Sequence, residues 1–151
     1  MSADALMWDQ YRKAEEGKLQ IEWKDQPTWA RKLLRRVESF LELQRDWDGY
    51  GAAPIDPILA AHALQVLADF ASNDCPEPSV VPTTSGGVQV EWHVYGIDFE
   101  FEILPDCYLA LYGNDRRTGR EFEPESTADR ASVKSWIDEL ARRNQQCLVN
   151  S

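Results

Sequence analysis

The most recognisable spacing of chemically active residues lies between positions 46 and 51. Asp46, Asp48 and Gly51 match positions 1, 3 and 6 of a calcium-binding loop, in which side-chain oxygens bind the ion. The match fails at position 5, which is Tyr50, and at position 12, where Pro57 replaces the bidentate glutamate. We therefore expect a structural corner here, with no metal and no cofactor.

A second candidate for chemistry is His93, which a predicted hairpin places beside Asp98. A histidine and an aspartate are two members of a Ser-His-Asp triad. However, the sequence has no G-x-S-x-G or comparable nucleophile turn, and its three cysteines show neither redox nor zinc spacing. We expect a protein that is not an enzyme. A small enzyme that uses His93 and a carboxylate is kept as an alternative.

The hairpin that positions these groups is the clearest pattern in the chain. V-Q-V-E-W-H-V (88–94) and I-D-F-E-F-E-I (97–103) both alternate with period two, and only Tyr95 and Gly96 separate them. A two-residue turn fixes the pairing, so Glu91 lies opposite Glu100. One face of the hairpin is wholly apolar. The other face carries Gln89, Glu91, His93, Asp98, Glu100 and Glu102.

Further strands are predicted around this hairpin. K-L-Q-I-E-W-K (18–24) alternates as a half-buried strand would, Val80 and Val81 suggest a short strand, and a third strand of the meander is predicted over 108–112. Residues 120–123 are expected to form an edge strand.

Helices are predicted from caps and apolar stripes. Ser2, Thr28, Asp56 and Ser126 are the expected N-caps, the last with Asp129 in the capping-box position. The elements together predict an α+β fold, in which an antiparallel meander of four to five strands packs against three to four helices. We expect a single domain over 1–151.

Charge is distributed unevenly along the chain. The net charge is −10, which argues against direct binding of nucleic acid and favours a basic partner. Between Arg45 and Arg116, 70 residues contain 12 Asp and Glu and no Lys or Arg. The opposite charge is concentrated in a strip of four residues, expected to be an exposed helix face: Arg31, Lys32, Arg35 and Arg36.

The acidic face of the hairpin has three interpretations. It is an ordinary solvated face, a docking surface for a basic protein, or, least favoured, a carboxylate metal site. A like-charge pair such as Glu91 and Glu100 is destabilising, which favours the docking surface. The predicted partner-binding residues are Glu91, Asp98, Glu100 and Glu102, with Asp46 and Asp48 as second choices.

The expected location is the cytoplasm. The odd number of cysteines is typical of a reducing compartment, and neither a signal peptide nor a membrane-spanning apolar run is recognisable. We therefore expect a protein without membrane contact.

Two segments carry a resemblance: W-D-G-Y-G-A-A-P-I (47–55) and P-T-T-S-G-G-V-Q-V-E-W (82–92), followed by the strand that ends I-L-P-D. Over residues 40–112 the chain resembles small uncharacterised bacterial and phage-associated proteins that have a W-D-G-x-G-A-x-P turn and a G-G-V-Q-x-E-W hairpin. The resemblance implies a compact fold and an accessory gene of the kind found beside toxin–antitoxin or phage loci. It also implies that 1–30 is an addition to a core at 31–145, and it implies no catalytic residue.

The expected function is that of a non-catalytic acidic binding module. The preferred partner is a basic protein or nucleoprotein complex, for example a CRISPR-type bacterial defence complex inhibited by a phage- or plasmid-borne protein. An antitoxin that neutralises a co-encoded toxin is the alternative in the same class.

Overall fold

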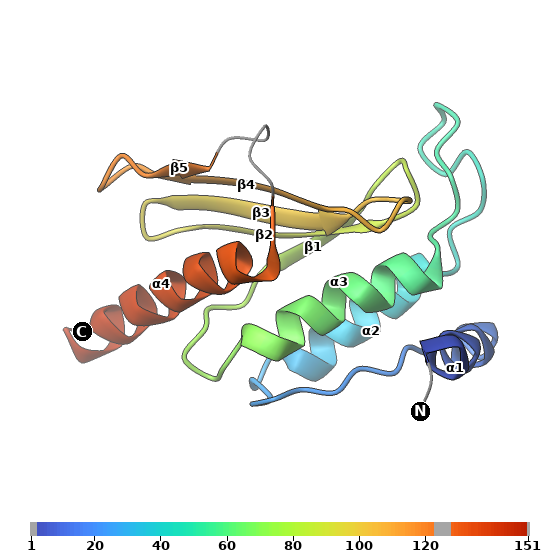
Figure 1. Cartoon of the computed structure of the whole chain (residues 1–151), viewed down its shortest axis with the longest axis horizontal. Helices are drawn as coiled ribbons and strands as arrows, with labels where there is room; N and C mark the ends of the chain where they lie inside the picture. The colour runs from blue at the N-terminus through green and yellow to red at the C-terminus, as the bar shows by residue number, and fades with distance from the viewer. Residues whose placement is uncertain (1–2, 123–127, 151) are drawn as a thin grey trace.

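The computed structural model describes residues 3–122 and 128–150 and has an α+β architecture (Figure 1). A five-stranded antiparallel sheet has four helices on one side of it (Figure 1). In chain order the elements are α1 (Ala3–Glu15), α2 (Ala30–Phe40), α3 (Pro57–Phe70), β1 (Ser79–Pro82), β2 (Val88–Val94), β3 (Ile97–Ile103), β4 (Leu109–Asp115), β5 (Glu121–Phe122) and α4 (Arg130–Val149). The predicted meander and its class are therefore confirmed.

The sheet is a simple meander with strand order β1-β2-β3-β4-β5. The predicted register of the central hairpin is confirmed, with Glu91 opposite Glu100 and His93 opposite Asp98. Its turn residues, Tyr95 and Gly96, both have positive φ, at 57° and 79°. This is the backbone of a type I′ turn, whose twist matches that of the strands it joins. The turn thus fixes which side chains share a face.

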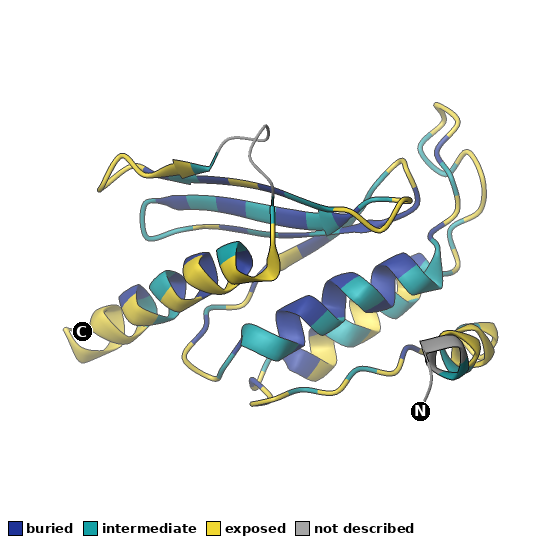
Figure 2. Ribbon diagram, in the orientation of Figure 1, coloured by how far each residue is buried: buried dark blue, intermediate teal, exposed yellow. Residues whose placement is uncertain are grey.

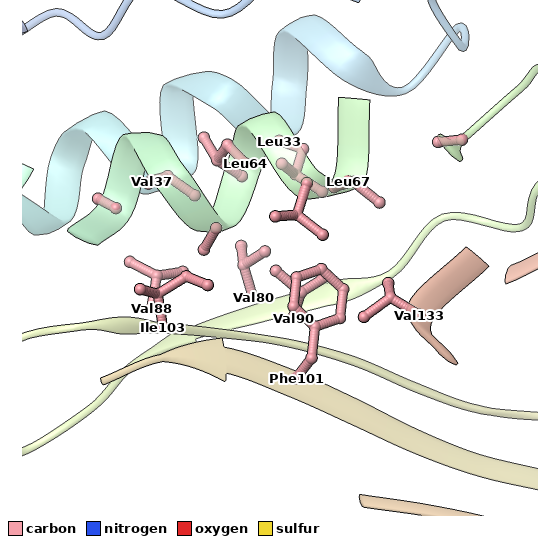
Figure 3. Close-up of a cluster of buried hydrophobic side chains, with 14 of the residues drawn as sticks. Leu33, Val37, Leu64, Leu67, Val80, Val88, Val90, Phe101, Ile103 and Val133 are labelled. Atoms are coloured by element: carbon pink, nitrogen blue, oxygen red, sulfur yellow. The ribbon is translucent and has the colours of Figure 1, made fainter. Parts of the chain in front are cut away.

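The inner face of the sheet forms the core with the helices. Figure 2 shows buried residues alternating with less buried ones along β2 and β3. Figure 3 shows the apolar side chains of this face meeting those of α2, α3 and α4. The labelled members of this cluster are Leu33, Val37, Leu64, Leu67, Val80, Val88, Val90, Phe101, Ile103 and Val133.

Helix α3 is the centre of the molecule, because strands β2 and β3 and helices α1 and α4 all contact it. Eight of its 14 residues are buried. Its predicted start is confirmed, since the Asp56 side chain accepts a hydrogen bond from the Ile58 amide and Pro57 is the first helical residue. Within the described residues, no helix has the length and apolar character needed to cross a bilayer.

The other predicted N-caps are not seen as predicted. Thr28 does not cap α2, which begins after Trp29 without a side-chain cap; the Thr28 amide instead donates to Asn73. Asp129 is itself the N-cap of α4, accepting from the Ser132 amide, so its predicted capping-box role is wrong. Ser2 and Ser126 lie outside the described residues.

The predicted strand at 18–24 is also wrong. The segment is extended, with Leu19 buried, but no strand among the described residues pairs with it. It runs along α3, where the Gln65 side chain bonds both the amide and the carbonyl of Glu22 and the Lys24 amide donates to the Ala68 carbonyl. Alternating hydrophobicity in the sequence therefore predicted an extended, half-buried segment correctly, but the element beside the segment is a helix instead of a strand.

Strand β4 extends beyond its predicted end and continues through Gly113 to Asp115. Gly113 is on the inner face, where a Cβ would lie 2.5 Å from the indole ring of Trp136. Trp136 in turn stacks on Phe99, with ring centroids 5.6 Å apart. Gly113 is thus required by the close packing of α4 on the sheet.

Candidate functional site

The outer face of the sheet brings together four of the six predicted binding residues, Glu91, Asp98, Glu100 and Glu102, and places Gln89 among them. We call these five residues the acidic face. Ala110 and Tyr112 on β4 flank it. The helices lie on the opposite side of the sheet (Figure 1). The acidic face is therefore presented outward by the same alternation that buries the core.

The structure contains the predicted like-charge pair, Glu91 opposite Glu100, at the centre of the acidic face. Gln89 lies between the two carboxylates, and its Nε2 donates to Glu91 Oε2 at 2.6 Å and to Glu100 Oε2 at 2.9 Å. Partial burial raises the pKa of Glu100, and the charges of Glu91 and Glu102 raise it further, against an opposing effect of His93. One neutral amide therefore holds two carboxylates together without neutralising either.

Asp98 is in a different state from the three glutamates. Its carboxylate is 2.8 Å from His93 Nδ1 and forms an ion pair with Arg116. The hydrogen bond with His93 and the charge of Arg116 lower the pKa of Asp98. Since Arg116 already neutralises it, Asp98 contributes less to the field of the acidic face than its position in the sequence implied.

His93 stands in the open, with 56% of its side chain exposed and Glu91 3.9 Å away. The four principal hollows over the described residues do not include it. His62, the other histidine, lines a different hollow with Cys107, and burial and then the charge of Arg130 lower its pKa. The two histidines therefore share no hollow.

Asp46 and Asp48 shape the corner in which they lie. Asp46 Oδ1 accepts from the Gly51 amide at 2.6 Å, and Asp48 Oδ1 accepts from the amides of Tyr50 and Ala52 at 2.8 and 3.0 Å. The two backbone bonds lower the pKa of Asp48. Among the described residues, no group of three or more His, Cys, Asp or Glu is placed to hold a metal ion.

The two aromatic residues of the corner, Trp47 and Tyr50, differ in burial. Trp47 is half-buried and donates from Nε1 to the Ala53 carbonyl at 2.8 Å, as a packing residue does. Tyr50 is 93% exposed, so it does not pack on the core as an aromatic residue at a helix corner is expected to. The reason is the pair of positive-φ glycines at 49 and 51, which carry the chain outward around Tyr50.

The corner packs directly on the turn between β1 and β2. The Ala53 amide donates to the Thr84 carbonyl at 3.0 Å, and the Asp56 amide donates to the Gly86 carbonyl at 2.8 Å. A Cβ at Gly86 would lie 3.0 Å from the Pro54 carbonyl oxygen, so the approach leaves room only for glycine. The two segments that carry the resemblance thus form one contact in space.

The basic strip on α2 has few partners inside the chain. Lys32 forms an ion pair with Glu77 at 3.3 Å, while Arg36 lies over the Phe40 ring and donates to the Val80 carbonyl. Both groups lie beside β1, at the edge of the sheet. Glu91 borders the same hollow as Lys32 and Arg36, but no ion pair among the described residues joins the strip to the acidic face.

A buried charge cluster on the inner side was not predicted. Arg143 donates to both carboxylate oxygens of Asp115 and to the carbonyl of Tyr95, and the Arg143 and Asp115 side chains are each 4% exposed. Glu139 also accepts from Arg143, at 2.7 Å. A signal existed in the sequence, since Arg143 follows Leu140 by three residues and continues the apolar stripe of α4.

Comparisons with protein-family models, with curated proteins and with solved structures gave no match to this chain.

Proposed function

We propose that the acidic face is a docking surface for a basic, nucleic-acid-handling protein, and that the chain acts as a non-catalytic inhibitor of that protein. The observation that supports this most is the Glu91–Glu100 pair. Two carboxylates directly opposite each other on paired strands cost roughly 0.2–1 kcal/mol, and solubility alone does not require that arrangement.

The second support is the lack of an internal counter-charge. Among the ion pairs of the described residues, Glu91 has only His93 as a partner, and neither Glu100 nor Glu102 has one. A partner that brings arginine or lysine side chains would relieve the repulsion and supply the missing donors. The acidic face is therefore better matched to a bound state than to an isolated one.

The mechanism would be competition for a phosphate-binding surface. Nucleic-acid-binding proteins use Lys and Arg to neutralise phosphates, and an outward row of carboxylates presents the same sign of charge. Long-range attraction raises the rate of encounter, and occupation of the basic surface then excludes nucleic acid. A bacterial defence complex, met by a phage- or plasmid-borne inhibitor in the cytoplasm, is the setting that we propose.

The open geometry around His93 favours this function over the enzyme alternative. A catalytic histidine needs a substrate held within hydrogen-bonding distance, usually in a concave site. His93 lies on an open sheet face and is shared between Asp98 and Glu91. An antitoxin would use the same acidic face, so the identity of the partner separates it from an inhibitor of a defence complex.

The test is capture of the partner from the host with two matched variants. The first reverses the acidic face: Glu91→Lys, Glu100→Lys and Glu102→Lys. The control makes the same change of net charge at exposed positions elsewhere: Glu15→Lys, Glu22→Lys and Asp25→Lys. We expect a basic partner with wild type and control and its loss with the first variant. Retention by the first variant, with its fold intact, would contradict the proposal.

A further inference from the structure

A small hollow lies within the acidic face, between β3 and β4. It has a volume of about 200 Å³ and is open to solvent. Ala110 lies opposite Glu102, and Tyr112 lies opposite Glu100, so the hollow is bounded by two successive cross-strand pairs. A volume of this size is below the roughly 300–1,000 Å³ of metabolite pockets, but it accommodates the end of one side chain.

The walls of the hollow differ in chemistry. Two carboxylates, of Glu100 and Glu102, stand on one strand, and the partly exposed ring of Tyr112 stands on the next. Gln89 completes the border, and its amide is committed to Glu91 and Glu100. Ala110 is the small residue in this ring of larger ones, and it leaves the space that they enclose.

The carboxylates that border the hollow have no cation beside them. Neither Glu100 nor Glu102 has an ion-pair partner among the described residues, so a cation for the hollow is best supplied from outside the chain. Oε2 of Glu102 is out of contact with solvent and lies on the β2 side, 3.7 Å from the position that a Cβ on Gly87 would take. The other oxygen of Glu102 and the carboxylate of Glu100 are therefore the acceptors that the hollow offers.

We propose that this hollow holds the guanidinium group of an arginine from the basic partner. The inference rests on the proposed docking function and names the group that the acidic face recognises. A guanidinium group is planar, presents a fork of N–H donors that suits carboxylates, and stacks on aromatic rings. An ammonium group is compact and strongly hydrated, so a lysine uses neither the aromatic wall nor the flat space beside Ala110 as well.

The test titrates the whole chain with N-acetyl-arginine amide and, separately, with N-acetyl-lysine amide, followed by amide NMR shifts. We expect saturable shifts centred on Gln89, Glu102, Ala110 and Tyr112, with arginine binding at least five-fold more tightly than lysine. Equal affinity of the two probes, or shifts spread evenly over all surface carboxylates, would overturn the inference.

Two variants separate a shaped site from general attraction. Ala110→Leu fills the hollow without changing the charge, and we expect it to abolish the preference for arginine. Asn114→Leu introduces the same side chain on the same strand and face, outside the hollow, and should preserve that preference. Glu102→Gln, which keeps the shape, should weaken arginine binding several-fold, and it serves if Ala110→Leu fails to fold.

The arginine-binding test and the charge-reversal test can fail separately. If Ala110→Leu binds arginine as wild type does, the hollow is not the recognition site, although charge reversal of the acidic face can still abolish partner binding. If charge reversal leaves partner binding unchanged, the proposed function fails, whatever the preference between the two probes.

Discussion

The carboxylates of β3 lie on the outer face of the sheet and that of β4, Asp115, lies on the inner face, and their surroundings differ. On the inner side Asp115 is buried, and Arg143 bonds both of its oxygens. On the outer side Glu100 lies opposite another glutamate, and the nearest donor is the neutral amide of Gln89. The chain therefore provides a cation for the buried Asp115, whereas on the outer face it provides an arginine only for Asp98 and none for Glu100 or Glu102 among the described residues.

The difference follows from the distribution of charge in the sequence. No lysine or arginine occurs from 46 to 115, so the strands cannot supply a counter-charge to each other. The arginines that pair with carboxylates of β3 and β4 come from the chain that follows β4, as Arg116 to Asp98 and Arg143 to Asp115. Both ion pairs lie toward one end of the sheet. Glu91, Glu100 and Glu102 have no arginine or lysine partner among the described ion pairs, which suits them to bind an external cation.

The largest effect is expected from the inner cluster. Asp115→Ala removes the buried, two-bond partner of Arg143 and leaves only Glu139 to pair with it. Breaking a buried ion pair in this way typically costs about 3–5 kcal/mol of folding stability. Urea unfolding at pH 7 measures the loss. Glu102→Ala on the outer face is the matched removal of a carboxylate and should change the free energy of unfolding by less than about 1 kcal/mol. Equal losses would contradict the contrast between the faces.

The second-largest difference in stability between the two faces is expected from a change in packing. Gly113→Ala places a methyl group against the Trp136 ring, and overpacking of this kind costs about 1–3 kcal/mol. Ala110→Leu adds a larger group on the same strand but toward solvent, and it should leave stability within about 0.5 kcal/mol. Thermal unfolding of both variants makes the comparison. A greater loss for Ala110→Leu would show that the outer face is not open.

Acid should weaken the inner cluster. Hydrogen bonds from Arg142 and then Arg143 lower the pKa of Glu139 from 4.5 to about 2. A depressed carboxyl pKa stabilises the fold above the unfolded value, and that contribution is lost as the pH falls through the folded value. Glu139→Gln should therefore be less stable than wild type at pH 7, and the difference should shrink between pH 4.5 and pH 2. Urea unfolding across that range measures it; a constant difference would contradict the assignment.

The smallest effect has the opposite sign. Because the folded pKa of Glu100 is raised, its ionised form opposes folding, and that penalty disappears as the pH falls through the folded pKa. Glu100→Gln should stabilise the fold by about 0.2–1 kcal/mol at pH 7 in low salt, and the gain should vanish in acid. Measured destabilisation at pH 7 would mean that the acidic face contributes to the fold itself.

The fold was predictable where local rules decide it. Period-two alternation and a two-residue turn determined the hairpin register, and with it the facing of Glu91 and Glu100. The cap and first residue of α3 followed from Asp56 and Pro57. The extended segment at 18–24 was mistaken for a strand because alternation reports burial, whereas pairing depends on which element lies alongside.

The candidate site was predictable only in part. Positions on the acidic face followed from register, but the neutralisation of Asp98 by Arg116 depends on the loop after β4. The carboxylates of Asp46 and Asp48 bond backbone amides, which spacing alone does not distinguish from metal ligands. The hollow beside Ala110 is a property of side-chain sizes on neighbouring strands, and the Asp115–Arg143 pair joins elements 28 residues apart.

The central claim is that a basic protein binds the acidic face. The most direct test measures the Kd of the captured partner by calorimetry for wild type, for the Glu91→Lys, Glu100→Lys, Glu102→Lys variant and for the charge-matched control at 15, 22 and 25. We predict a loss of about 100-fold or more for the first variant, since like charges brought together cost several kcal/mol. The control should stay within about threefold of wild type, because its carboxylates lie away from the acidic face. Equal weakening in both variants, or none in the first, would contradict the account.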